Sequence, residues 1–258
     1  MKYIIIIIFS IEYLNINALS KIYKMATAIK NVPKVITEDL GKIFEKGICG
    51  AYNTPYVGKY KYSEEEAAKF TQRLQKLPEL FPQCTHTAEK GAQYDFTATN
   101  ESNTHLSAKT NKQGDKVCPQ KIGQPSKKKF CEYFDLDHTT MTGNDIKQYI
   151  MVNLKSMLPH YFKYTFDCPI IYYNQKSDKI LFVKNIATID WDQVAISFSH
   201  MLREKEWNES TSISIKVDDK QVNIGEFQIH TKRDGIKFRW NFETLLKLFP
   251  EKFSVQQI

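Results

Sequence analysis

Three polar residues on two neighbouring predicted strands could together carry out phosphodiester chemistry. Asp95 lies in a β-rich stretch, residues 92–99, and Ser107 and Lys109 lie in the next one, residues 104–110. Residues two apart on a strand point to the same face of a sheet, so Ser107 and Lys109 share a side. If the hairpin register places Asp95 opposite them, we expect a carboxylate, a hydroxyl and an ammonium to meet.

This set of groups fits a magnesium-dependent hydrolase of phosphodiester bonds. Mg²⁺ prefers oxygen ligands, so Asp95 is predicted to hold the ion. The ion would polarise the phosphate and lower the pKa of a bound water. The ammonium of Lys109 would favour the deprotonated water and offset the negative charge that grows on the phosphate.

The pattern resembles the PD-(D/E)XK nuclease superfamily, the fold of many type II restriction endonucleases. The resemblance rests on Tyr94-Asp95, a short hairpin, Ser107-Ala108-Lys109 and an acidic helix start at residues 64–66. Tyr94 stands where the superfamily often has a proline, which ligates nothing. The resemblance covers residues 64–134 and implies a restriction-endonuclease-like core, Mg²⁺ as the cofactor and double-stranded DNA as the substrate.

Ser107 departs from the superfamily pattern, which usually has Glu or Asp at this position. Because a neutral hydroxyl is a weak ligand for Mg²⁺, a second carboxylate is expected from elsewhere in the chain. Glu66 is the first choice for this catalytic ligand, and Glu132 and Glu101 are the alternatives. In the other interpretation, Glu66 and its acidic neighbours only stabilise the N-terminus of a helix.

The composition indicates a globular protein, and its basic balance is compatible with a polyanionic partner. The chain has 258 residues, of which 42% are hydrophobic and 25% charged, which excludes disordered and collagen-like classes. Its net charge is +7. Five cysteines without a C-x-x-C pair favour a reducing, cytoplasmic location over a disulfide framework. The sequence has no Gly-rich phosphate loop and no G-x-S-x-G elbow, so nucleotide-driven motors and serine hydrolases lack support.

Residues 1–24 are predicted to be an N-terminal extension that is not part of the fold. The apolar run that begins at Ile4 is interrupted at Glu12, far short of the roughly 20 apolar residues of a membrane helix. Ala18-Leu19-Ser20 is a poor cleavage site for a secretion signal. We therefore expect no membrane association, and a single nuclease domain over residues 25–258 with Met25 as its working start.

The predicted fold class is α/β (α+β), with a central mixed β-sheet flanked by helices and a C-terminal β-meander. Helices are predicted over residues 35–48, with Gly50 as the stop signal, from Ser63 to before Pro78, from Pro125 through Phe134, over 145–158 and over 191–202. Besides the hairpin, strands are predicted over residues 169–173, 179–183, 212–217, 222–230 and 236–240.

Two basic regions are predicted to bind DNA. Lys127 and Lys128 lie at the start of a predicted helix, whose free N–H groups could also bind a phosphate. The C-terminal region, about residues 205–258, contains a β-hairpin that we predict to read base edges. Its candidate residues are Gln228, His230, Arg233 and Arg239. In the alternative interpretations the lysines form a solvated face, and Arg239 pairs with Glu226 across the strands.

Together these features predict a type II-like restriction endonuclease that cuts both strands of a short DNA site with Mg²⁺. The symmetry of such sites predicts a homodimer, and the resemblance implies a cognate DNA methyltransferase in the same genome. Two alternatives stay open. One is a structure-selective DNA repair nuclease on the same fold, and the other is a non-catalytic nucleic-acid-binding module.

Overall fold

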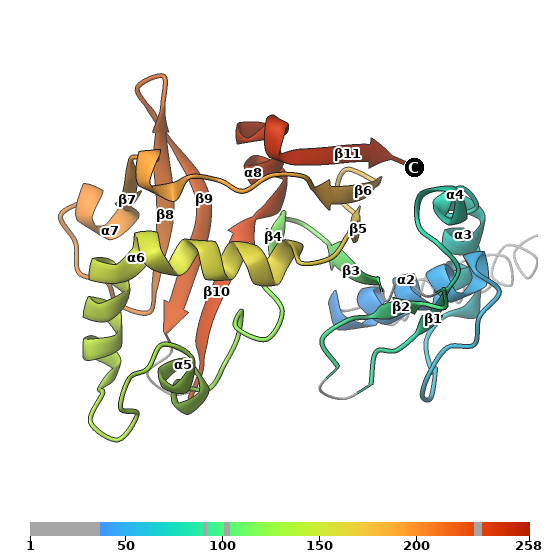
Figure 1. Cartoon of the computed structure of the whole chain (residues 1–258), viewed down its shortest axis with the longest axis horizontal. Helices are drawn as coiled ribbons and strands as arrows, with labels where there is room; N and C mark the ends of the chain where they lie inside the picture. The colour runs from blue at the N-terminus through green and yellow to red at the C-terminus, as the bar shows by residue number, and fades with distance from the viewer. Residues whose placement is uncertain (1–36, 90–91, 101–103, 230–233) are drawn as a thin grey trace, which may run out of the picture. The chain divides into compact units, whose positions relative to one another are not determined.

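The computed structural model describes residues 37–89, 92–100, 104–229 and 234–258, so the predicted extension lies outside the described residues. Residues 37–258 form one compact unit. It contains a six-stranded sheet, a five-stranded sheet and helices that pack on both (Figure 1). The predicted fold class, a mixed sheet flanked by helices, is confirmed.

The six-stranded sheet carries the predicted hairpin. Its strands, in sheet order, are β1 (Cys84–His86), β2 (Phe96–Ala98), β3 (His105–Asn111), β5 (Ile170–Asn174), β6 (Lys179–Asn185) and β11 (Phe253–Gln257). β3 and β5 are parallel, and the other neighbours are antiparallel. β11 lies beside β6, so the last strand of the chain leaves the predicted C-terminal recognition region and joins this sheet (Figure 1).

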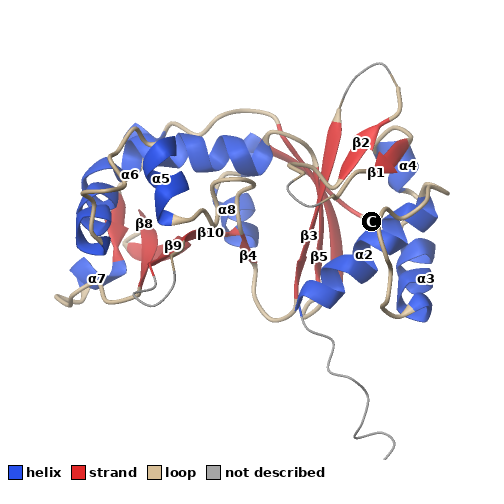
Figure 2. Cartoon of the chain, turned by 90° about the horizontal axis from the view of Figure 1, so that it is seen from below, coloured by secondary structure: helices blue, strands red, loops and turns tan. Residues whose placement is uncertain are grey.

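Helices α2 (Thr37–Ala51) and α3 (Glu64–Arg73) pack together, and α2 also lies against β3 (Figure 2). The prediction that Gly50 ends the first helix is wrong, because α2 continues to Ala51. Glycine is instead needed for the close approach of α3. A Cβ atom on Gly47 would overlap Phe70, and one on Gly50 would overlap Thr71.

The end of the second predicted helix is also earlier than expected. Ser63 caps α3 by accepting a hydrogen bond from the backbone N–H of Glu66, as the sequence pattern predicts. α3 ends at Arg73, and Pro78 lies in the first turn of a separate short helix, α4 (Leu77–Leu80). A proline is tolerated there because the first turn does not use its N–H.

The five-stranded sheet is antiparallel throughout and contains the predicted meander. Its strands, in sheet order, are β4 (Lys116–Val117), β10 (Ile236–Asn241), β9 (Lys220–Ile229), β8 (Ser210–Val217) and β7 (Ile196–Phe198). Asp218 and Asp219 connect β8 to β9 with φ angles of 45° and 62°. Two left-handed residues are typical of the tight turn that joins twisted antiparallel strands.

One long helix, α6 (Gly143–Phe166), lies across this sheet (Figure 1). The ring of Tyr161 lies 4.3 Å from that of Phe238, and Trp240 Nε1 donates to Thr165 Oγ1 at 2.9 Å. The predicted helix end at Leu158 is therefore too early. α6 continues through Pro159 because its last two turns bury aromatic side chains in the core. The remaining helices are α5 (Lys127–Tyr133), α7 (Ser199–Leu202), α8 (Phe242–Leu248), η1 (Trp191–Gln193) and η2 (Pro250–Lys252).

The predicted helix over residues 191–202 is wrong. The segment contains η1, the strand β7 and the four-residue helix α7. Ile196 pairs with Ile215 and Phe198 pairs with Ile213, so the segment forms an edge of the five-stranded sheet. Short apolar runs fit a helix or a strand equally well, and here the neighbouring strand decides.

All five cysteines are free thiols. Among the described residues, no helix has the length and apolar character needed to span a membrane.

Candidate active site

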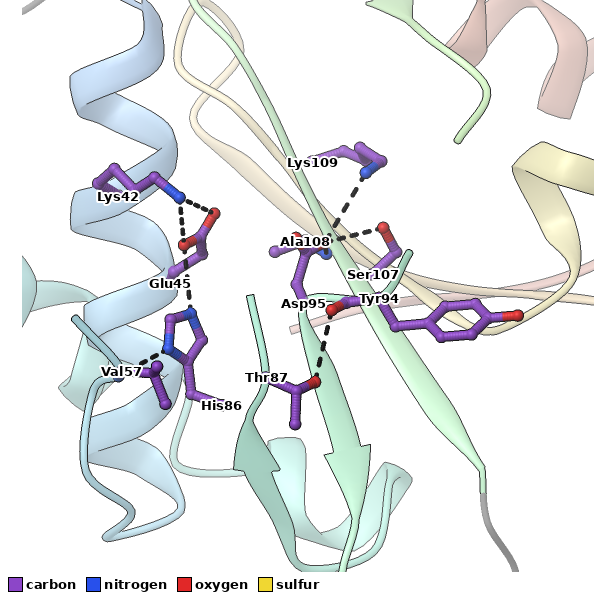
Figure 3. A network of polar contacts seen from close by, with 10 residues as sticks. All are labelled: Lys42, Glu45, Val57, His86, Thr87, Tyr94, Asp95, Ser107, Ala108 and Lys109. Atoms are coloured by element: carbon purple, nitrogen blue, oxygen red, sulfur yellow. Dashed lines mark hydrogen bonds and ion pairs between the residues drawn. The ribbon is translucent and has the colours of Figure 1, made fainter. Parts of the chain in front are cut away.

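Asp95, Ser107 and Lys109 meet where β2 begins beside β3 (Figure 3). Asp95 precedes β2 by one residue, and the β2–β3 register places it beside Ser107. Its Oδ2 atom accepts hydrogen bonds from Ser107 Oγ at 2.9 Å and from the Ala108 N–H at 2.7 Å. Lys109 Nζ lies 3.7 Å from the same oxygen. The expected meeting of a carboxylate, a hydroxyl and an ammonium is therefore found.

The backbone around Asp95 is held by residues on both sides. The Asp95 carbonyl accepts a hydrogen bond from the Thr87 N–H at 2.9 Å. The Tyr94 hydroxyl donates to Asp167 Oδ2 at 2.9 Å, and its ring stacks on His105 at 3.9 Å. Burial, together with the bond to Asp167, raises the pKa of Tyr94 to about 12. The phenol therefore stays protonated and keeps its donor role.

Two thiols lie close to Lys109, but they are poor nucleophiles. Burial raises the pKa of Cys168 to about 12, although the nearby Lys109 acts in the opposite direction. Burial also raises the pKa of Cys118, again against the charge of Lys109. Because the thiolate is the reactive form, both groups stay unreactive at neutral pH.

The predicted second acid, Glu66, makes its contacts elsewhere. Its side chain is 50% exposed, and its Oε1 atom lies 2.7 Å from Lys69 Nζ in the same helix. In the described part of the chain, no hydrogen bond or ion pair joins Glu66 to Asp95 or Lys109. These contacts match the interpretation in which Glu66 belongs to a helix start.

Of the two alternative acids, the structure describes Glu132 alone. Glu132 is 57% exposed and lies 3.8 Å from Lys128 Nζ within α5. Glu101 lies outside the described residues.

Sequence reasoning missed another buried acid, Glu45, which lies on α2 and bonds to His86 on β1 (Figure 3). Its side chain is only 9% exposed, and His86 and Lys42 bond to its carboxylate. A signal was present in the sequence. Glu45 is four residues after Gly41 and three before the buried Ile48, so it lies on the packed face of the helix.

The donors present suit Mg²⁺ better than a transition metal. Among the described residues, no group of three or more His, Cys, Asp and Glu side chains could hold a metal ion. Mg²⁺ usually keeps several waters and needs only one or two carboxylates. Asp95, whose side chain is 22% exposed, could provide one such carboxylate.

At the N-terminus of α5, two of the backbone N–H groups that were predicted to be free to bind a phosphate already have partners. The Lys127 N–H donates to Asp234 Oδ1 at 2.9 Å, and the Lys129 N–H donates to Ser126 Oγ. These backbone donors are therefore already used. The side chains of Lys127 and Lys128 stay candidates for DNA contact, and that of Lys128 is 63% exposed.

In the predicted recognition hairpin, the structure shows the alternative pairing. Glu226 on β9 lies opposite Arg239 on β10, and the two form an ion pair. Lys116 on β4 bonds to the same carboxylate, and Gln228 Nε2 donates to it at 2.9 Å. Although burial alone would raise the pKa of Glu226, the bonds from Lys116 and Arg239 lower it below its ordinary value.

The remaining two candidates of the hairpin cannot be placed. His230 and Arg233 lie outside the described residues. Gln228 and Arg239 share the polar face of the five-stranded sheet, because their side chains meet at the same carboxylate.

Fold and site define an α/β protein that holds an acid, a hydroxyl and an ammonium at one hairpin of a mixed sheet. Among curated proteins, the chain is similar to the type II restriction enzyme CviAII of Paramecium bursaria Chlorella virus 1. The two are 50% identical over 222 residues, which are 86% of this chain. The chain spans 63% of the length of that relative. No protein-family model and no solved structure matches the chain.

Proposed function

We propose that this chain is a type II-like restriction endonuclease, which hydrolyses phosphodiester bonds of double-stranded DNA at a short specific sequence. The observation that carries the proposal is the 50% identity to a type II restriction enzyme over most of the chain. The 3.7 Å approach of Lys109 to Asp95 supports it, because it supplies the groups that such hydrolysis needs.

The proposed mechanism uses Mg²⁺ as cofactor. When bound, Mg²⁺ polarises the phosphate and lowers the pKa of a water molecule. Asp95 would hold the ion, while Ser107 and the Ala108 N–H fix the carboxylate in place. Lys109 stabilises the negative charge that develops on the phosphate. The water oxygen forms a bond to phosphorus, one P–O ester bond breaks, and the departing oxygen takes up a proton.

The proposed DNA contacts lie on two elements. Lys127 and Lys128 would contact phosphates, which adds affinity without sequence information. Gln228 and Arg239 would read base edges from the polar face of the β9–β10 hairpin, and His230 and Arg233 are proposed to take part in the same readout. Glu226 keeps Arg239 and Gln228 fixed in this arrangement, which limits the number of orientations in which they meet DNA.

The partners follow from the same proposal. A chain that cuts both strands of a symmetric site would act as a homodimer. Its host would carry a cognate DNA methyltransferase, and the enzyme would act in the cytoplasm. The free state of all five cysteines supports a reducing compartment.

Incubation of the purified protein with plasmid DNA and Mg²⁺ tests the function. We expect discrete fragments, whose ends define one sequence, and no cleavage when EDTA removes the metal. Cleavage confined to branched DNA would indicate the structure-selective repair nuclease instead. Intact DNA that is shifted in a gel would indicate the non-catalytic binding module.

A further inference from the structure

One face of the five-stranded sheet is polar and carries a largely buried carboxylate. On β9 and β10, Phe227 and Phe238 face α6, since the ring of Tyr161 packs against both. Side chains alternate along a strand, so Glu226 and its cross-strand partner Arg239 lie on the opposite face. The Glu226 side chain is only 10% exposed, and burial of a charge is costly unless partners compensate for the lost hydration.

Two cations and one amide provide this compensation. Lys116 on β4 bonds to Glu226 Oε2, and Arg239 on β10 bonds to Glu226 Oε1. Gln228 Nε2 also donates to Oε1, at 2.9 Å. Burial raises the pKa of Glu226, but the bonds from Lys116 and Arg239 outweigh it, so the carboxylate is ionised at neutral pH. Glu226 therefore neutralises part of the positive charge of this face.

Polar atoms without a partner lie beside these ion pairs. Among the side chains that the structure describes, Arg239 Nε and Asn241 Oδ1 are buried and have no hydrogen-bond partner. Both residues belong to β10 and are two positions apart, so they share the polar face. Buried polar atoms in folded proteins almost always have a partner. An unused donor and an unused acceptor therefore indicate that this face binds a polar ligand, and the base edges of DNA offer both kinds of group.

The polar face adjoins the candidate active site. The strand β4, which begins at Lys116, is the next strand after β3 along the chain. Burial raises the pKa of Cys118, while the charges of Arg239 and Lys109 act on the same thiol in the opposite direction. One thiol is thus close both to a cation of the polar face and to the ammonium of the candidate site. A duplex bound to this face would lie next to the groups that are proposed to cut it.

We infer that Glu226 is a specificity-determining residue, whose carboxylate holds Lys116 and Arg239 away from the phosphates of unrelated DNA. The inference rests on the proposed function. Binding to unrelated DNA depends on cations that neutralise phosphates and release counterions. A cation that must first leave a largely buried ion pair gains less from a phosphate. Target DNA adds base contacts to Arg239 and Gln228, so the restraint by Glu226 acts mainly against other sequences.

Binding of a fluorescein-labelled oligo(dA)·oligo(dT) duplex to the full chain tests the inference without cleavage. Fluorescence anisotropy in EDTA, at several salt concentrations, measures the affinity. We expect folded Glu226→Gln to bind this duplex at least about fivefold more tightly, and the slope of log affinity against log salt to be steeper by about 1–2, because freed cations contact phosphates. Glu226→Asp keeps the charge and should stay close to the wild-type affinity. The matched control Asp219→Asn removes an exposed acid from the turn of the same sheet and should change the affinity much less.

Lys116 provides a comparison that a merely structural role of Glu226 would not affect. In the wild type Glu226 holds Lys116, so Lys116→Ala should weaken binding to the duplex by less than about twofold. In the Glu226→Gln background the ammonium is free, and the same change should weaken binding by about fivefold. The two effects are therefore expected to be non-additive.

Wild-type affinity of folded Glu226→Gln for the duplex, or an equal gain in Asp219→Asn, would overturn the inference and leave the proposed function intact. Equal losses from Lys116→Ala in the two backgrounds would overturn it as well. If the wild type yields no discrete fragments from plasmid DNA, yet Glu226→Gln binds the duplex more tightly, the proposed function is wrong and the restraint by Glu226 holds.

Should Glu226→Gln fail to fold, a comparison within the wild type decides. Lys237 lies on β10 two residues before Arg239 and shares the polar face, and in the described part of the chain no ion pair holds it. Lys237→Ala should therefore weaken binding to the duplex by about fivefold, and Lys116→Ala by less than about twofold. Equal losses in these two variants would overturn the inference.

Discussion

At the scale of single residues, Ser107 changes what the strand β3 supplies. The superfamily pattern has an acid here, whereas this chain has a buried hydroxyl that donates to Asp95 Oδ2 at 2.9 Å. A donor at this position fixes the Asp95 carboxylate and brings no negative charge of its own. If the proposed metal site is correct, Ser107 supports the Asp95 ligand instead of acting as a ligand itself.

Glu226 gives a prediction of pH dependence. Burial opposes its ionisation, but the bonds from Lys116 and Arg239 hold its folded pKa below the ordinary value of 4.5. A lowered folded pKa stabilises the protein above that value, and this contribution is lost as the pH falls below it. We expect the free energy of unfolding, measured with urea, to decrease below about pH 4.5 in the wild type, and to decrease less in Glu226→Gln.

At neutral pH, the free energy of unfolding of the same Glu226→Gln variant should be lower than that of the wild type by about 1–3 kcal/mol, because the variant loses its charged hydrogen bonds to Lys116 and Arg239. Glu65→Gln removes an exposed acid and serves as the control. If the free energy of unfolding depends on pH in the same way in Glu226→Gln and in the wild type, the ion pairs around Glu226 contribute nothing to stability.

At the scale of elements, the close packing of α2 on α3 depends on Gly47, a residue of α2 that has no side chain. We expect Gly47→Ala to reduce the free energy of unfolding by about 1–3 kcal/mol, because the added methyl would overlap Phe70. Gly143→Ala is the matched control, since a Cβ at this other helical glycine meets open space. Thermal unfolding compares the two variants, and an unchanged Gly47→Ala would contradict the close approach of these helices.

The proposed recognition hairpin predicts a loss of binding that depends on sequence. In an Asp95→Asn background, which should bind without cutting, Gln228→Ala should weaken binding to the target site by about 1–3 kcal/mol and leave binding to unrelated DNA almost unchanged. Lys128→Ala should weaken both equally and reduce the salt dependence of binding. Fluorescence anisotropy at several salt concentrations measures both effects. A uniform loss in Gln228→Ala would argue against base readout.

Local patterns predicted the elements well where the signal lies within a few neighbouring residues. The hairpin that holds Asp95, the Ser63 cap and the C-terminal meander all follow from short-range spacing. The strand β7 and the second half of α6 do not, because contacts with distant residues decide them. The helix was predicted to end at Leu158, yet the aromatic core beyond that residue stabilises two more turns.

The same distinction applies to the candidate site. Asp95, Ser107 and Lys109 lie within 15 positions of each other along the chain, so a hairpin register was enough to predict that they meet. Glu45 is a different case. Local spacing places it on the packed face of α2, but its bond to His86 joins residues 41 positions apart, which local spacing does not predict. The role of Glu66 as the second acid stays a prediction, and the contact that its side chain makes with Lys69 lies within α3.

At the scale of the whole molecule, one buried hydrophobic cluster includes residues of both sheets, α6 and α8. All three tryptophans, Trp191, Trp207 and Trp240, belong to it. We therefore expect tryptophan fluorescence and far-UV circular dichroism to report the same unfolding midpoint in urea. Two separate midpoints would show that the sheets unfold independently.

Cleavage of plasmid DNA by Asp95→Asn and Lys109→Ala, each compared with the wild type at saturating Mg²⁺, tests the central claim most directly. If the carboxylate and the ammonium on these strands carry out the hydrolysis, each variant should fold normally and cut at least about 100-fold more slowly. The exposed control variants Asp219→Asn and Lys69→Ala should cut at the wild-type rate. Wild-type cleavage by either folded site variant would contradict the account.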